Sequence, residues 1–101
     1  MRQITEEAYD AFKKKKRFTL RNTKVRIVDG NPYLYLHDNL IVKEINGEIF
    51  INNGGWNSNT TRERLNPFVN KIRKHGNSLI INEKLDWDGE WLNITQFNGN
   101  K

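Results

Sequence analysis

The sequence contains no cysteine, and its apolar runs are short. Without cysteine the chain cannot form a disulfide, a thiolate nucleophile or a thiolate zinc site. A helix that crosses a bilayer needs about 20 apolar residues, so the short runs exclude one. The acidic, amphipathic start of the chain also lacks the basic and then apolar pattern of a secretory signal. We therefore expect a cytoplasmic protein that makes no use of a membrane.

The residue types that carry most catalysis are also scarce. His37 and His75 are the only two histidines, and a metal site would need carboxylates from unrelated segments to join them. Ser58 and Ser78 lie in turn contexts without a nucleophile elbow. Asp86-Trp87-Asp88-Gly89-Glu90 lacks the ligand pattern of a calcium loop. We expect no catalytic activity, no metal and no cofactor.

Positive charge is abundant and unevenly distributed. The chain has 17 Lys and Arg against 12 Asp and Glu, a formal net charge of +5. Eight of these cations lie between positions 13 and 26, with no acid among them: Lys13, Lys14, Lys15, Lys16, Arg17, Arg21, Lys24 and Arg26. We expect them to form one patch that faces a polyanion, of which nucleic-acid phosphate is the commonest. The alternative is a solvated helix end whose lysines complement the helix dipole.

Aromatic residues close to this basic run add a second feature of nucleic-acid binding. Phe18, Tyr33 and Tyr35 could stack on exposed bases, and we expect Tyr33 and Tyr35 to take part in binding. Further along, Gly54-Gly55-Trp56 precedes a helix start but lacks the spacing and lysine of a phosphate-binding loop. Whether that loop is functional or structural stays open.

A second basic group lies in the segment from 62 to 75. Its members are Arg62, Arg64, Lys71, Arg73, Lys74 and His75. At helical spacing Arg64 and Lys71 share an outward face, while Leu65, Phe68, Val69 and Ile72 point into the core. Arg62 and Arg64 are therefore further candidates for phosphate contacts, although ordinary surface helices have the same pattern.

The pattern of apolar residues and turns predicts an α+β fold in a single domain, residues 1–101, with 98–101 as a frayed tail. We expect an N-terminal helix over 5–16 with Thr5 as its cap. An antiparallel meander of three to four strands follows over 24–52, with Asn46-Gly47 as its strongest hairpin turn. A capping box from Thr60 then starts a bent helical segment that runs to His75 and ends at Gly76.

The last expected element is a C-terminal β-hairpin around Asp88-Gly89, which would place Trp87 opposite Glu90 and Leu85 opposite Leu92. In that arrangement Leu85, Trp87, Leu92 and Ile94 form the buried face, and Trp91 lies on the other side.

Several short motifs in the middle of the chain occur together in a known type of protein. They are the strand 36–42, the Gly-Trp at 55–56, the Thr-Thr-Arg at 60–62 and the Arg-Leu-Asn at 64–66. With these motifs the chain resembles a recurrent type of small tailed-phage protein of unknown function. The resemblance implies phage origin and an accessory or early-gene role in an infected bacterial cell. It implies no catalytic residues.

Two functional hypotheses follow. In the first, the protein binds DNA or RNA through the basic run, mostly by phosphate contacts and with little sequence preference. In the second, it inhibits a host or defence enzyme by protein–protein contact, a host-takeover or anti-CRISPR-like role in which the basic face docks on an acidic surface. The sequence leaves the oligomeric state, the partner's identity and the choice between DNA and RNA open.

Overall fold

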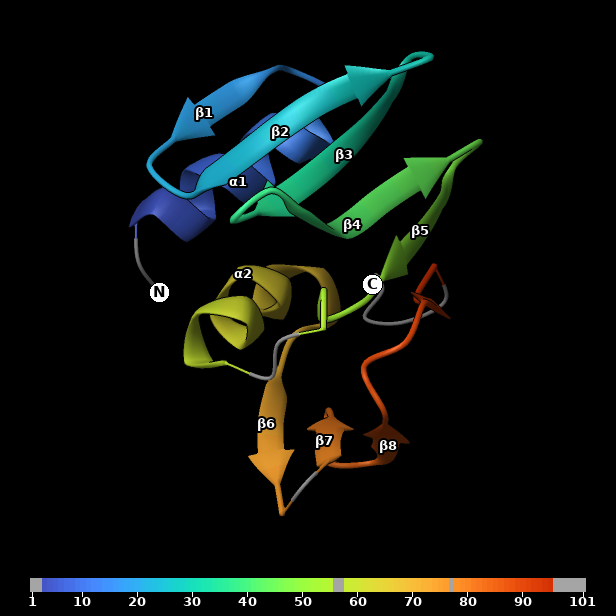
Figure 1. Cartoon of the computed structure of the whole chain (residues 1–101). Coiled ribbons are helices and arrows are strands. Elements are labelled where there is room, and N and C mark those ends of the chain that lie inside the picture. The colour runs from blue at the N-terminus through green and yellow to red at the C-terminus, as the bar shows by residue number, and fades with distance from the viewer. Residues whose placement is uncertain (1–2, 56–57, 77, 96–101) are drawn as a thin grey trace.

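The chain forms two helices and nine strands in two antiparallel sheets within residues 3–55, 58–76 and 78–95, the part that this computed structural model describes (Figure 1). The elements are α1 (Gln3–Lys13), β1 (Phe18–Leu20), β2 (Thr23–Val28), β3 (Asn31–Leu36), β4 (Asn39–Ile45), β5 (Glu48–Ile51), α2 (Asn59–Val69), β6 (Ile72–His75), β7 (Ser78–Ile81), β8 (Leu85–Trp87) and β9 (Leu92–Asn93). The predicted α+β class is confirmed. The expected frayed tail lies outside the described residues.

The larger sheet has six strands in the order β1-β2-β3-β4-β5-β9, and α1 packs against one of its faces (Figure 1). The alternation in β2 and β3 causes this packing, because Val25, Leu34 and Leu36 all point to the α1 side and are buried there. From α1, Ala8 and Phe12 complete the contact. Thr5 does not cap α1 as expected, because it lies inside the helix and its side chain is buried.

Two-residue turns hold the predicted meander together, and the structure extends it by one strand at each end. Asn46 and Gly47 both have positive φ, 52° and 87°, which is the backbone of the tight turn that suits a twisted hairpin. The pairing of Ile45 with Glu48 across that turn confirms the predicted hairpin. The short strands β1 and β9 then add to the two edges.

The segment after Gly55 corrects the predicted bent helix. Ser58, and not Thr60, caps α2, because its side chain accepts a hydrogen bond of 3.1 Å from the Thr61 backbone N–H. The helix continues through Pro67 to Val69, and residues 72–75 form strand β6. Gly76, expected to end a helix, lies beyond β6 in the turn to β7.

Side-chain caps and strand pairing explain why the helix stops early. The Asn66 side chain accepts a hydrogen bond of 2.9 Å from the Ile72 backbone N–H, and the chain leaves the helix at Asn70 with a φ of 96°. Ile72 then pairs with Ile81 of β7. The pairing partner comes nine positions later in the chain, so helical spacing of the cations alone could not reveal this strand.

The predicted C-terminal hairpin is wrong. β8 pairs with β7 in the smaller, three-stranded sheet, whereas β9 pairs with β5 in the larger one, so Leu85 and Leu92 belong to different sheets. Burial follows the prediction only in part: Trp87 and Ile94 are buried and Leu92 is partly buried, but Leu85 is 38% exposed. The residues around Gly89 therefore connect the two sheets.

Gly89 allows this connection, and replacing it with alanine should lower the free energy of unfolding by about 1–2 kcal/mol. Its φ is +91°, and an added Cβ would overlap the side-chain amide of Asn53. The Asn53 backbone N–H also donates to the Gly89 carbonyl at 2.9 Å, so the two loops cannot easily separate. Urea unfolding measures the effect. Gly30→Ala is the control, since it has a similar φ of +82° but open space around it, and an equal loss in both variants would contradict the packing argument.

One hydrophobic cluster contains buried residues of both sheets and both helices. In Figure 1, α2 lies between the larger sheet and strands β6, β7 and β8. Phe68 connects α2 to α1, because its ring packs edge to face on the rings of Tyr9 and Phe12, with 4.9 and 5.0 Å between ring centres. No helix in the described part of the chain is long and apolar enough to span a bilayer.

Candidate nucleic-acid interface

The candidate interface is the face of the larger sheet opposite α1, which we call the outer face. Figure 1 is viewed from this side, with α1 behind the first strands. Side chains of a strand alternate between the two faces, so the burial of Val25 and Leu34 against α1 turns Lys24, Arg26, Tyr33 and Tyr35 outward. These four residues are all predicted contacts, and the structure brings them together.

Strand register arranges the outer face in rows that cross the sheet. In the first row Arg26 of β2 pairs with Tyr33 of β3, Tyr33 with Lys43 of β4, and Lys43 with Phe50 of β5. The second row starts on the edge strand and contains Thr19, Lys24, Tyr35 and Leu40. In the first row, cations and rings therefore alternate across four strands.

Cations and aromatic rings of this face also contact one another directly. The Arg26 guanidinium lies 6.0 Å from the centre of the Tyr35 ring. The Lys43 ammonium lies 4.2 Å from the Trp91 ring and 6.0 Å from the Phe50 ring. Such contacts restrain long side chains without neutralising their charge. Trp91 is 42% exposed.

Carboxylates neutralise only part of the positive charge here. Lys24 Nζ lies 3.3 Å from Oδ1 of Asp38, in the turn between β3 and β4, so Lys24 is partly compensated. In the described part of the chain, no carboxylate forms an ion pair with Arg17, Arg26 or Lys43. Arg17 belongs to the same surface, because it lines a hollow of about 500 Å³ with Thr19, Lys24, Val25, Arg26 and Ile27.

The lysine run lies at the end of α1, just before Arg17. All four lysines are exposed: Lys13 is the last residue of α1, and Lys14, Lys15 and Lys16 lie in the turn that leads to Arg17 and β1. Lys13 lies 5.9 Å from the Tyr9 ring, and Lys15 Nζ lies 3.8 Å from a Glu44 carboxylate oxygen. One lysine of the run is therefore paired within the protein.

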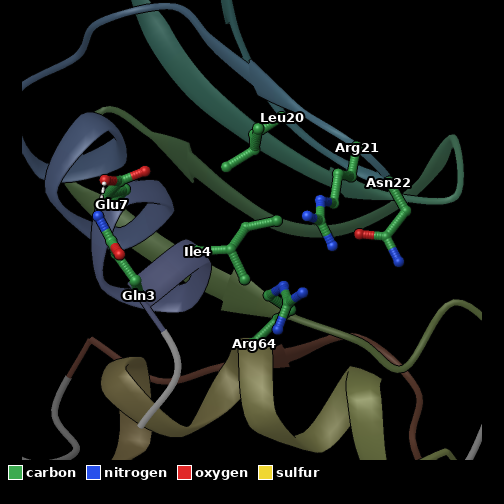
Figure 2. Close-up of a pocket in the computed structure, with 7 residues that line it drawn as sticks. All are labelled: Gln3, Ile4, Glu7, Leu20, Arg21, Asn22 and Arg64. Carbon is green, nitrogen blue, oxygen red and sulfur yellow. Dashed lines mark hydrogen bonds between the residues drawn. The ribbon is translucent and has the colours of Figure 1, made fainter.

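Arg21 is separated from the rest of the predicted patch. It lies in the turn after β1, whereas Arg17 lies before β1, so the strand stands between them. Figure 2 shows Arg21 at a different cavity of about 610 Å³, which it lines with Gln3, Ile4, Glu7, Leu20, Asn22 and Arg64. The eight cations that lie close together in the sequence therefore do not form one patch, because Arg21, in the β1–β2 turn, lies apart from the others.

Arg64 corrects the prediction of an exposed cationic helix face. Its side chain is only 2% exposed, at the base of the cavity in Figure 2, where it cannot lie along a nucleic-acid backbone. Its Nε donates to Thr23 Oγ1 at 3.0 Å, and its Nη1 donates to Thr5 Oγ1 at 2.8 Å and to Glu63 Oε1 at 2.9 Å. This arginine connects α2 to α1 and β2. Arg62, two positions earlier, is partly exposed and donates to the Asn59 side chain.

The other cations of the second basic group lie on the smaller sheet. Lys71 and Arg73 share Glu83, at 3.4 and 2.7 Å, so an acid within the protein offsets both. The hydrogen bond from Arg73 is the main cause that lowers the pKa of Glu83, and the same bond raises the pKa of Arg73. The carboxylate therefore stays charged at neutral pH and keeps this cluster partly neutralised. Lys74 and His75 are exposed at the end of β6.

Lys43 and Phe50 are interface residues that the sequence interpretation missed. The signal was present, because a two-residue turn at Asn46-Gly47 places Lys43 opposite Phe50 as soon as the hairpin is recognised. Trp56, in the loop whose role the sequence leaves open, lies outside the described residues.

Comparison with protein families gives one informative match. The family model described as Kyanoviridae Gp96 protein matches residues 1–100 of the chain. No curated protein and no solved structure matches the chain. The match agrees with the phage origin that the resemblance implies.

Proposed function

The chain belongs to the Kyanoviridae Gp96 family of phage proteins, and from that premise we propose that it is an accessory protein that binds nucleic acid through its outer face with little sequence specificity. It acts by binding and not by catalysis, in the cytoplasm of the infected host cell. The observation that carries the proposal is the alternation of uncompensated cations and aromatic rings on the outer face.

Phosphate contacts explain how such a surface would bind. Each cation that neutralises a phosphate releases a condensed counterion, and this release favours binding whatever the base sequence. Arg17, Arg26 and Lys43 have no internal acid partner within the described chain, so binding would not have to break an ion pair. The lysine run at the end of α1 would add longer-range attraction.

Low sequence specificity follows from the same contacts. Phosphate contacts set position and orientation but carry no sequence information. Reading of duplex sequence usually needs an element that enters the major groove. Both helices pack against other elements of the fold: α1 against the larger sheet, and α2 against α1 and β6. The outer face therefore offers charge and rings but no projecting helix.

Removing the outer-face cations should weaken binding strongly. In the triple variant Arg17→Gln, Arg26→Gln, Lys43→Gln, we expect the dissociation constant for a labelled oligonucleotide to rise by about tenfold or more at about 50 mM salt. The slope of log affinity against log salt concentration should become shallower by about one for each phosphate that the variant no longer neutralises. Fluorescence anisotropy at several salt concentrations measures both quantities.

A matched variant separates local contacts from total charge. Lys71→Gln, Lys74→Gln, Lys84→Gln lowers the formal net charge by the same amount on the opposite, smaller-sheet end of the molecule. We expect it to retain most of the affinity and most of the salt dependence. Equal losses in the two triple variants would contradict an outer-face site. Absence of any binding at about 50 mM salt would overturn the proposal and leave an acidic host protein as the partner to test.

A further inference from the structure

Resting on the proposed function, we infer that the outer face takes single-stranded nucleic acid, whose bases stack on Tyr33 and Tyr35 while Arg26 and Lys43 hold its phosphates. Sequence-tolerant binding of a single strand combines a cationic surface with exposed rings on which bases stack. On the outer face, cations and rings occupy paired positions of neighbouring strands.

The positions of the two tyrosines suit stacking. They are separated by one residue on β3, a central strand, so both rings stand on the same face of the sheet. Both are partly exposed, and each has a cation as its cross-strand partner on β2. A base on either ring would therefore lie within reach of a guanidinium or ammonium group for its phosphate.

The size of the surface fits a short stretch of single strand. Neighbouring strands lie about 4.8 Å apart, so the row from Arg26 to Phe50 extends about 14 Å across the sheet. Along β3, Tyr33 and Tyr35 are separated by about 7 Å. This surface is large enough for a few unstacked nucleotides that lie flat on the sheet.

A duplex would use only part of this surface. Its bases are already stacked on one another, so their faces are closed to the tyrosine rings, and only its phosphates would meet the cations. The energy of base stacking, and hence the preference for a single strand, comes from the rings alone.

Trp91 has a different role from the tyrosines. The Lys43 ammonium already lies over its ring at 4.2 Å, so that face of the indole is occupied. Trp91 is therefore a positioning residue that holds Lys43 over the sheet. In the variant Trp91→Leu we expect weaker binding of single strand and duplex alike, by about threefold, since Lys43 is then no longer restrained where it meets a phosphate.

The test compares two double variants on three ligands. Tyr33→Leu, Tyr35→Leu removes the rings, whereas Tyr33→Phe, Tyr35→Phe keeps them and removes only the hydroxyls. The ligands are oligo(dT), oligo(U) and a duplex DNA, each about 12 nucleotides or base pairs long and at the same salt concentration. Circular dichroism and thermal unfolding confirm that each variant keeps its fold.

We expect the native protein to bind the single strands about tenfold more tightly than the duplex. The leucine variant should lose about tenfold in affinity for both single strands and little for the duplex, while the phenylalanine variant stays within about twofold of the native protein. A similar loss for DNA and RNA indicates stacking without 2′-hydroxyl contacts, and a loss for one of the two alone assigns the site to that strand chemistry. Photocrosslinking of 5-iodouracil oligonucleotides should map to Tyr33 or Tyr35.

The outcomes distinguish this inference from the proposed function. If duplex and single strand bind with equal affinity and the leucine variant keeps its full affinity, the inferred base stacking is wrong, although the proposal of nucleic-acid binding is retained. If no ligand binds the native protein, both fail.

Discussion

Replacing Arg64 with methionine should lower the free energy of unfolding by about 3–4 kcal/mol, one of the two largest effects we predict. The guanidinium group is buried, and its hydrogen bonds to Thr5 and Thr23 join α2 to α1 and to β2. Methionine fills much of the space but donates no hydrogen bond. The Thr5 hydroxyl would stay buried without the donor that Arg64 supplies, and the ion pair between Arg64 and Glu63 would be lost.

Two further variants show whether charge or geometry matters at this position. Arg64→Lys keeps the charge but has a single ammonium group, which cannot reproduce the fork that meets Thr5 and Thr23 together, so we expect an intermediate loss. Arg73→Met, which removes an exposed pair with Glu83, should change stability little. Urea unfolding at constant pH measures all three. A methionine variant as stable as the native chain would contradict the connecting role of Arg64.

Replacing Phe12 with alanine should cost about 3–5 kcal/mol of unfolding free energy. The Phe12 side chain is fully buried between α1 and the larger sheet, and its ring packs edge to face on Phe68 at 5.0 Å. Alanine would leave a cavity in the cluster that joins both sheets. It would also remove an aromatic pair that contributes about 1 kcal/mol beyond its buried area.

Graded and matched variants sharpen the Phe12 prediction. Phe12→Leu keeps most of the volume and should cost about 1.5 kcal/mol or less. Phe50→Ala removes the same ring from the partly exposed outer face and should cost less than Phe12→Ala. Thermal and chemical unfolding measure the three variants. Equal losses at positions 12 and 50 would contradict the assignment of the inner face as the core.

Local sequence patterns predict the exposure of some basic residues but not of others. Lys24 and Arg26 alternate with apolar residues on a strand, and alternation alone turns them to one face. Arg64 has the same charge on a helix, where spacing indicated exposure, yet it is buried. Its burial depends on hydroxyl groups of Thr5 and Thr23, which are distant in the chain, and no local pattern reveals such partners.

Strand pairing shows the same limit. The hairpin at Asn46-Gly47 joins neighbouring strands, and the turn residues themselves impose the register. The turn at Asp88-Gly89 also has a two-residue hairpin signal, but its two arms pair with β7 and β5 instead of with each other. Trp87 and Ile94 are buried in the shared core, and the packing of the whole core overrides the local turn preference.

By itself the sequence determined the α+β class, the central meander and the face on which Lys24, Arg26, Tyr33 and Tyr35 lie, because these depend on alternation and on tight turns between neighbours in the chain. Only the tertiary structure decided that Arg64 is internal, that residues 72–75 are a strand, and that Trp91 lies beside Lys43. Those outcomes depend on contacts between distant segments, whose free energy is realised only when the whole core packs at once.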